Sequence, residues 1–130
     1  MSISVSVTQE TGYRYVKVKG TYSLSDAYAL FDRIYAESLE TNCKNTLLDI
    51  SEVAGKVPGM DRFNLAAYAS RLWKYPIRVA IVYRAEEIDK FFENAGSNRG
   101  VSTIVVPDVQ TALKWLIGNT PSKSDAGDRK

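Results

Sequence analysis

Residues 49–62 hold most of the side chains in this chain that could do chemistry. Asp49 and Ser51 stand two positions apart at the end of an apolar run, so an extended strand would present both on one face. As a functional pair they would bind a cation or a polar ligand. As a structural pair they would cap loop amides in an Asx or ST turn. The sequence leaves both interpretations open.

Three charged residues follow in the same stretch: Lys56, Asp61 and Arg62. Lys56 and Arg62 would either hold an anion beside the free amides of a helix start or form a solvated surface. Asp61 suits the first turn of a helix whatever its function, because the helix dipole favours a negative charge there. Farther along, Arg99 would point to the carboxyl edge of the sheet or contact a partner. We predict a partner-binding site from these residues together with Asp49 and Ser51.

The residue types argue against enzymatic and metal chemistry. The chain has no histidine and a single cysteine, Cys43, which removes the commonest general base, the usual nucleophilic triads and most transition-metal sites. Glu86 and Glu87 are adjacent, so on a helix they face different directions and make a poor acid–base pair. We therefore expect no enzymatic activity, no metal and no cofactor. A hydrolase using Asp49, Asp61 or Glu86 is the least favoured alternative.

Length and charge point to one domain without a strongly charged surface. The chain has 130 residues, with 17 basic and 15 acidic side chains, so no strong field would attract nucleic acid or an anionic membrane. No apolar run is long enough to cross a bilayer, and the first ten residues do not have the pattern of a signal peptide. One cysteine fits a reducing compartment, so we expect a cytoplasmic protein. We predict one domain over residues 1–118 and a flexible tail over residues 119–130.

Apolar periodicity predicts alternating strands and helices. Ile3, Val5 and Val7 alternate with serines, and a second alternating run covers residues 13–19 after a turn at Gly12, which predicts an antiparallel hairpin with a half-buried edge strand. The remaining expected elements are a helix at about 24–41, a strand at 46–50, a helix at about 59–74, a strand at 78–83, a short helix at 86–95, a strand at 102–106, and a helix between Asp108 and Gly118.

Two of these helices have a predicted inner face. Helix 24–41, for which Ser23 is the expected N-cap, has apolar side chains at helical spacing. They are Leu24, Ala27, Tyr28, Phe31, Ile34 and Tyr35. For helix 59–74, the predicted inner face consists of Phe63, Ala66, Ala67, Ser70 and Trp73.

Strands that alternate with helices after a hairpin imply right-handed crossovers and a mostly parallel sheet. The predicted fold is α/β, with a mixed, mostly parallel five-stranded sheet, the element order β-β-α-β-α-β-α-β-α, and helices packed mainly on one face. The polar outer face of the hairpin predicts a sheet that is covered on one side only at that edge. Tyr13 and Tyr15 would then be available to a second subunit, or would make ordinary cross-strand packing.

The order and spacing of four segments resemble the STAS domain family of anti-sigma-factor antagonists. The segments are LLDISEVAGK at 47–56, GMDRF at 59–63, VAIVY at 79–83, and NRG followed by IVV and ALKWL between 98 and 116. Within that family the chain looks most like the small bacterial SpoIIAA-like, or STAS/Sec14-like, proteins. The resemblance implies an α/β domain without catalytic activity that acts by binding, in one branch through the loop between a strand and a helix.

In that branch the loop carries an Asp-Ser-Ser-Gly motif with a phosphorylatable serine at the start of the helix. Here the corresponding positions, around residues 57–61, contain no serine or threonine. The remaining hydroxyl of the stretch, Ser51, stands at the end of the strand and is only a weak candidate for phosphorylation. We therefore predict no phosphorylation.

Together these features predict a cytoplasmic, non-enzymatic protein-interaction module with a regulatory role, which presents the loop after Ile50 to a protein partner. Self-association into a homodimer stays open, and no nucleic acid and no stable membrane insertion are expected. The alternative is a carrier of a lipid or another small ligand in an aromatic-lined pocket, although aromatic residues at helical spacing also fit an ordinary core. The lining would come from Tyr28, Phe31, Tyr35, Phe63, Phe91 and Phe92.

Overall fold

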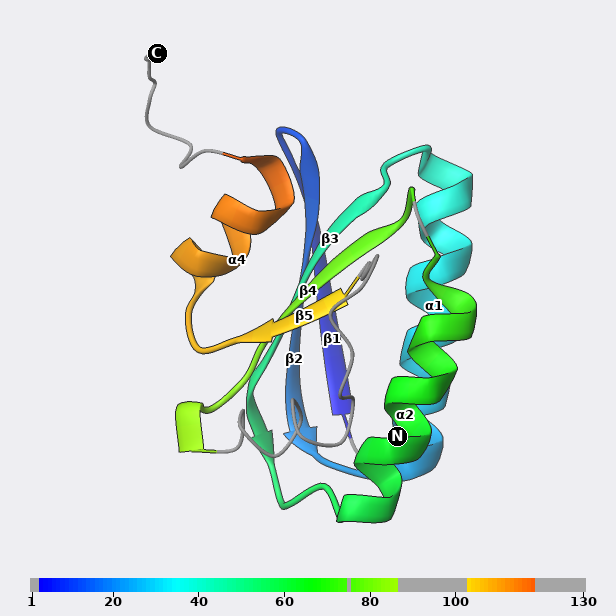
Figure 1. Ribbon diagram of the computed structural model, residues 1–130, viewed down its shortest axis with the longest axis vertical. Coiled ribbons are helices and arrows are strands. Elements are labelled where there is room, and N and C mark those ends of the chain that lie inside the picture. The colour runs from blue at the N-terminus through cyan, green and yellow to red at the C-terminus, as the bar shows by residue number, and fades with distance from the viewer. Residues whose placement is uncertain (1–2, 75, 87–102, 119–130) are drawn as a thin grey trace.

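A five-stranded sheet forms the centre of the molecule (Figure 1). The computed structural model describes residues 3–74, 76–86 and 103–118. Within them the strands are β1 (Ile3–Glu10), β2 (Tyr13–Thr21), β3 (Asn45–Ala54), β4 (Arg78–Val82) and β5 (Thr103–Val106), and the helices are α1 (Leu24–Thr41), α2 (Gly59–Leu72) and α4 (Val109–Ile117). Apart from Glu86, the helix expected at 86–95 lies outside the described residues, as do Arg99 and the tail expected at 119–130.

The strands follow the same order in the sheet as in the chain. β1 pairs antiparallel with β2, and each later neighbouring pair is parallel. The turn between β1 and β2 contains Gly12, whose φ of 87° lies in the left-handed region that glycine adopts without strain. The predicted hairpin and the predicted α/β fold, with a mixed and mostly parallel five-stranded sheet, are confirmed.

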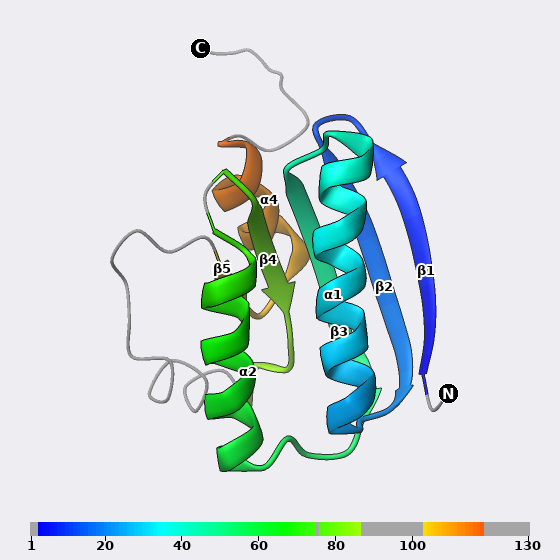
Figure 2. The ribbon, with the colours of Figure 1, turned by 90° about the vertical axis from the view of Figure 1, so that its right-hand side faces the viewer.

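The sequential strand order explains where the helices lie. Right-handed crossovers between parallel strands that always advance in one direction place every connecting helix on the same face. α1 connects β2 to β3 and α2 connects β3 to β4, and both lie on one face of the sheet (Figure 1 and Figure 2). α4 follows the last strand, is free of this constraint, and covers the opposite face. Two of the three described helices therefore share a face, as predicted.

Each face of the sheet has its own apolar core. On the α1 and α2 face, Phe31 packs against Trp73 with ring centroids 4.4 Å apart, and the indole N–H of Trp73 donates to the Phe31 carbonyl. The other buried members of this core are Val16, Val18, Leu30, Ile34, Leu48, Val53, Val57, Leu65, Ala69, Ile77, Val79, Ile81 and Tyr83. The α4 face has a smaller core of Leu47, Ala80, Val82, Val106, Ala112, Leu113 and Leu116. Because β3 and β4 contribute to both cores, they form the buried centre of the sheet.

Side chains cap the starts of α1 and α4, at the expected cap Ser23 and at the expected boundary Asp108. Ser23 Oγ accepts a hydrogen bond from the amide of Asp26 at 3.3 Å, and Asp108 Oδ1 accepts one from the amide of Thr111 at 2.7 Å. The bond from Thr111 stabilises the carboxylate and lowers the pKa of Asp108. α4 ends at Gly118, whose φ of 78° is left-handed.

The predicted inner face of α1 is confirmed, because all six of its residues are buried or pack against the core. The predicted inner face of α2 is right for Trp73, which is buried in the core, and wrong for Phe63 and Ser70. Phe63 is 56% exposed and Ser70 is exposed, whereas Leu65 and Ala69 are buried. Leu65, Ala69 and Leu72 also follow helical spacing, and it is these residues that pack in the core on the α1 and α2 face, which leaves Phe63 exposed.

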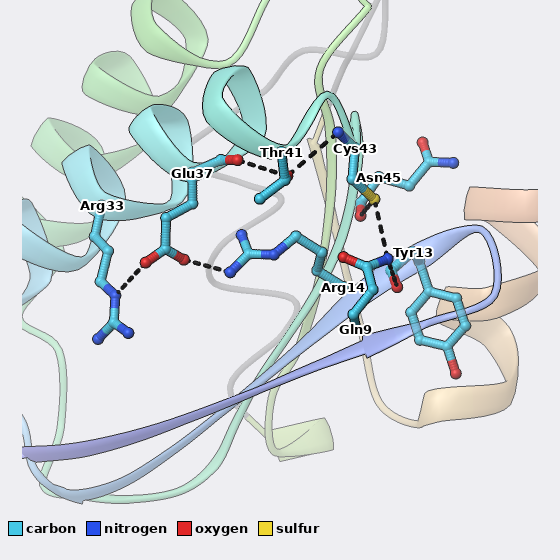
Figure 3. Close-up of polar contacts among 8 residues, drawn as sticks. All are labelled: Gln9, Tyr13, Arg14, Arg33, Glu37, Thr41, Cys43 and Asn45. Carbon is cyan, nitrogen blue, oxygen red and sulfur yellow. Dashed lines mark hydrogen bonds and ion pairs between the residues drawn. The ribbon is translucent and has the colours of Figure 1, made fainter.

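A cluster of polar contacts joins the last turns of α1 to the hairpin (Figure 3). Arg14 of β2 is buried and pairs with Glu37 of α1, which also accepts a hydrogen bond from Arg33 Nε at 2.9 Å. Burial opposes ionisation of Glu37, but the hydrogen bonds from Arg33 and Arg14 outweigh it and lower its pKa. A partly buried ion pair therefore fixes this part of α1 against the sheet.

Candidate functional site

β3 extends beyond its predicted end, running to Ala54 rather than to Ile50. Between Asp49 and Glu52 its pairing with β2 shifts by one residue, which makes a bulge in β3. Ser51 lies in this bulge and donates to Asp49 Oδ1 from its amide at 3.0 Å and from its hydroxyl at 2.7 Å. These two hydrogen bonds lie within β3 and stabilise the bulge.

Asp49 is an internal acceptor of hydrogen bonds. It is 5% exposed, and its second oxygen accepts from the Tyr15 hydroxyl at 3.2 Å. Burial raises the pKa of Tyr15, and the neighbouring Asp49 carboxylate adds to the rise. Asp49 therefore caps the Ser51 amide, as the structural interpretation expects, and whether the pair also binds a ligand stays a prediction.

Residues 55–58 connect β3 to α2 and form the β3–α2 loop. Hydrogen bonds from two separate segments of the chain fix the backbone where this loop begins. Tyr22, which follows β2, donates its amide to Ala54 O at 2.9 Å. Arg84, which follows β4, donates from Nη1 to Val53 O at 2.7 Å and from Nη2 to Gly55 O at 3.2 Å. The parallel register brings both neighbours to the end of β3, so the backbone that enters the loop has fixed hydrogen-bond partners on both sides.

The second half of the loop is held by the first turn of α2. Val57 is buried in the core, and its carbonyl accepts a hydrogen bond from the Arg62 guanidinium. Asp61 Oδ2 accepts a hydrogen bond from the Tyr22 hydroxyl at 2.8 Å. Burial and this hydrogen bond raise the pKa of Tyr22 strongly. The hydrogen bonds of Asp61 and Arg62 therefore stabilise the second half of the loop.

Two large apolar side chains are left exposed beside this fixed loop. Met60 is 70% exposed and Phe63 is 56% exposed, and both lie in the first turns of α2. Their spacing of three residues places them next to each other on one face of the helix. In the described parts of the chain the remaining large exposed hydrophobic residue is Leu39, on α1. The pair of Met60 and Phe63, with exposed Lys56 and Pro58 before it, forms the candidate surface.

The structure brings together some of the predicted site residues and separates others. Lys56, Asp61 and Arg62 lie around the β3–α2 loop, whereas Asp49 and Ser51 lie inside β3 at the bulge. Whether any of them contacts a partner stays a prediction. Arg99 is outside the described residues.

Sequence reasoning missed the residues that anchor the loop and placed an exposed residue in the core. Tyr22 follows β2 and Arg84 follows β4, the two strands that neighbour β3. A side chain with hydrogen-bond donors just after a neighbouring strand was the signal in the sequence that could have identified these anchors. For Phe63 the signal was the competing spacing of Leu65 and Leu72, which favours a different rotation of α2.

The aromatic residues proposed for a carrier pocket lie in different surroundings. Phe31 is in the core, Tyr28 packs edge-on against Tyr68 with centroids 4.9 Å apart, and Phe63 is exposed. Phe91 and Phe92 are outside the described residues.

Within the residues that the structure describes, no three metal-ligating side chains gather in one place. Across the same ranges, no helix has the length and apolar character needed to span a membrane.

Comparison with known proteins relates the chain to solved structures. No family model and no curated protein matches the sequence. A crystal structure of an anti-sigma factor antagonist from Mycobacterium paratuberculosis is 20% identical, with a TM-score of 0.63 over 88% of this chain and 94% of that one. An uncharacterised protein with a SpoIIAA-like fold from Shewanella loihica is 21% identical, with a TM-score of 0.50 over 88% of this chain and 93% of that one. At these identities the likeness is one of fold.

Proposed function

From the SpoIIAA-like fold of this chain, we propose that it is a non-enzymatic regulatory module that binds a protein partner through the β3–α2 loop and the first turns of α2. A structural neighbour that is an anti-sigma factor antagonist supports a regulatory role. Since one fold can host many functions, the proposal rests on the surface of this chain rather than on the fold.

The exposed pair of Met60 and Phe63 carries the proposal. Large apolar side chains that are adjacent and exposed often mark a protein interface, and aromatic residues and methionine are enriched there. The backbone beside the pair is held by Tyr22 and Arg84, so little conformational entropy remains to be lost when a partner binds.

The carboxylates nearest the loop support a role without catalysis. Asp49 accepts hydrogen bonds from Ser51 and Tyr15, and Asp61 accepts one from Tyr22. Asp49 stabilises the bulge of β3 and Asp61 holds the Tyr22 side chain, so the hydrogen bonds of both carboxylates have a structural role. We further propose a cytoplasmic location, for which the single, half-buried thiol of Cys43 is suited.

Phosphorylation is not part of the proposed regulation. No serine or threonine lies between residues 52 and 69. At Ser51 a phosphate would replace the hydroxyl that donates to Asp49 and would put about two negative charges beside a buried carboxylate. Repulsion and the cost of burial oppose such a modification.

The proposal predicts that replacing Met60 and Phe63 together by serine abolishes partner capture. Each side chain contributes about 1.5–3 kcal/mol when it is fully buried, so losing both weakens binding by far more than tenfold. The measurement is quantitative mass spectrometry of proteins captured from native lysate by wild-type and variant protein.

Leu39→Ser is the matched control, because Leu39 is 52% exposed on another helix. It should capture the same proteins as the wild type, and all three proteins should unfold at similar temperatures. Equal capture by the double variant and the wild type would show that the partner does not bind through Met60 and Phe63.

A further inference from the structure

β1 is an open edge of the sheet (Figure 2). Its eight residues pair with β2 on one side, and among the described strands none pairs with its other side. The outward backbone N–H and C=O groups of such an edge form a row that another strand can extend.

From Ile3 to Gln9, β1 has none of the sequence features by which natural proteins usually block a free edge. Those features are charged side chains, proline, a bulge, or a very short strand. From Ile3 to Gln9 there is no charge and no proline. The pairing with β2 runs from Ile3 opposite Gly20 to Glu10 opposite Tyr13 without a shift in register. The edge is therefore long, regular and uncharged over most of its length.

The sequence of this edge fits a second copy of itself. Residues 3–7 read Ile-Ser-Val-Ser-Val, a pattern of apolar residues and serines that is the same in both directions. Antiparallel pairing about a twofold axis at Val5 sets Ile3 opposite Val7, and Ser4 opposite Ser6. Opposite residues in antiparallel strands share a face, so apolar residues meet apolar residues and serines meet serines.

The two faces of β1 suit this arrangement. Ile3, Val5 and Val7 are half-buried and pack against the core, so a second copy would cover what remains exposed of them. Ser4 and Ser6 are exposed on the other face. No like charges meet across the axis within residues 3–7.

We propose that this protein forms a twofold homodimer in which β1 pairs antiparallel with β1 of a second copy, so that two five-stranded sheets become one continuous sheet. The dimer is a property beyond the proposed partner-binding role. α2 lies away from β1 (Figure 2), so the pair of Met60 and Phe63 stays accessible in the dimer.

The proposed interface predicts a reversible dimer. One pair of edge strands lies at the low end of interface sizes, below about 1,200 Å² in total, where complexes are weak. Sedimentation velocity of the full chain from low to high micromolar concentration should therefore show a shift from monomer to dimer.

Charged variants test the pairing itself. The double variant Ser4→Lys with Ser6→Lys sets lysine opposite lysine across the axis, which weakens association about tenfold or more. The double variant Ser4→Glu with Ser6→Glu also sets like charges opposite each other. In its monomer, however, the new carboxylates lie opposite Lys19 and Lys17 of β2, which favours folding.

The most specific test of the pairing mixes the double lysine variant with the double glutamate variant. Each lysine of one chain then faces a glutamate of the other, so the mixture should recover a dimer that neither variant forms alone at the same concentration. Ser25→Lys with Ser70→Lys, at two exposed helix positions, is the matched control and should dimerise like the wild type. A wild type that stays monomeric throughout, or a lysine variant that associates as tightly as the wild type, would overturn the proposal.

Discussion

Arg14 is a buried cation that forms an ion pair with the carboxylate of Glu37. Glu37 also binds Arg33, and these bonds lower its pKa in the folded protein despite the opposing effect of burial. A carboxyl group whose pKa is lowered by folding stabilises the native state above its unfolded pKa of about 4.3. That contribution is lost as the pH falls through the folded pKa.

We therefore predict that Glu37→Gln destabilises the protein at neutral pH and much less in acid. Removing one partner of a fully buried pair costs about 3–5 kcal/mol, and the partial exposure of Glu37 reduces this to about 1–2 kcal/mol. Urea unfolding of both proteins from pH 7 to pH 3 measures the difference.

The exposed Glu40, on the same helix, supplies the control for this experiment. Glu40→Gln should leave the free energy of unfolding nearly unchanged at neutral pH. A destabilisation by Glu37→Gln that is the same at pH 3 and pH 7 would contradict the assigned role of the ion pair.

At the scale of elements, β3 shows what apolar periodicity can and cannot predict. Leu48 and Ile50 alternate with period two, but Val53 is out of phase, so the pattern indicated a strand that ends at Ile50. The bulge at Ser51 adds one residue and returns Val53 to the same core as Leu48. A strand with a bulge has no single period, so the sequence did not show where Asp49 lies in β3. It could therefore not decide between a structural cap and a ligand-binding role for Asp49.

The β3–α2 loop leads to a prediction at the same scale. Tyr22→Phe removes the hydroxyl that donates to Asp61 and leaves the ring in place. Because Asp61 is half-buried and can regain water, the cost to stability should be about 1 kcal/mol. Hydrogen exchange should become faster at the amides of the first turn of α2, measured by mass spectrometry.

Tyr35→Phe is the matched control for Tyr22→Phe. Among the described residues, the Tyr35 hydroxyl has no hydrogen-bond partner, so its loss should change neither stability nor exchange at α2. Unchanged exchange in Tyr22→Phe would show that this hydrogen bond does not hold the loop.

At the scale of the whole molecule, two cores share the strands β3 and β4. The order of the described elements could be predicted because strand and helix periods differ and their boundaries carry clear signals at Gly12, Ser23 and Asp108. The rotation of α2 could not be chosen with the same certainty, because two sets of residues share helical spacing and only packing against the sheet decides between them.

The second core predicts that α4 is needed for the stability of the whole domain. Leu116 is almost fully buried there, so Leu116→Ala should lower the free energy of unfolding by about 2–4 kcal/mol in chemical denaturation. Leu39→Ala, at an exposed position, should change it by less than about 0.5 kcal/mol. A similar small effect for both variants would mean that α4 contributes little to folding.

The central claim is that a protein partner binds where Met60 and Phe63 are exposed. Site-specific photo-crosslinking in native cells tests it most directly, with a photoreactive residue placed at position 60, at position 63, or at position 39 as the exposed control on another helix. The account predicts a covalent adduct with the same partner from positions 60 and 63 and none from position 39. No adduct from positions 60 and 63, or an equally strong adduct from position 39, would contradict it.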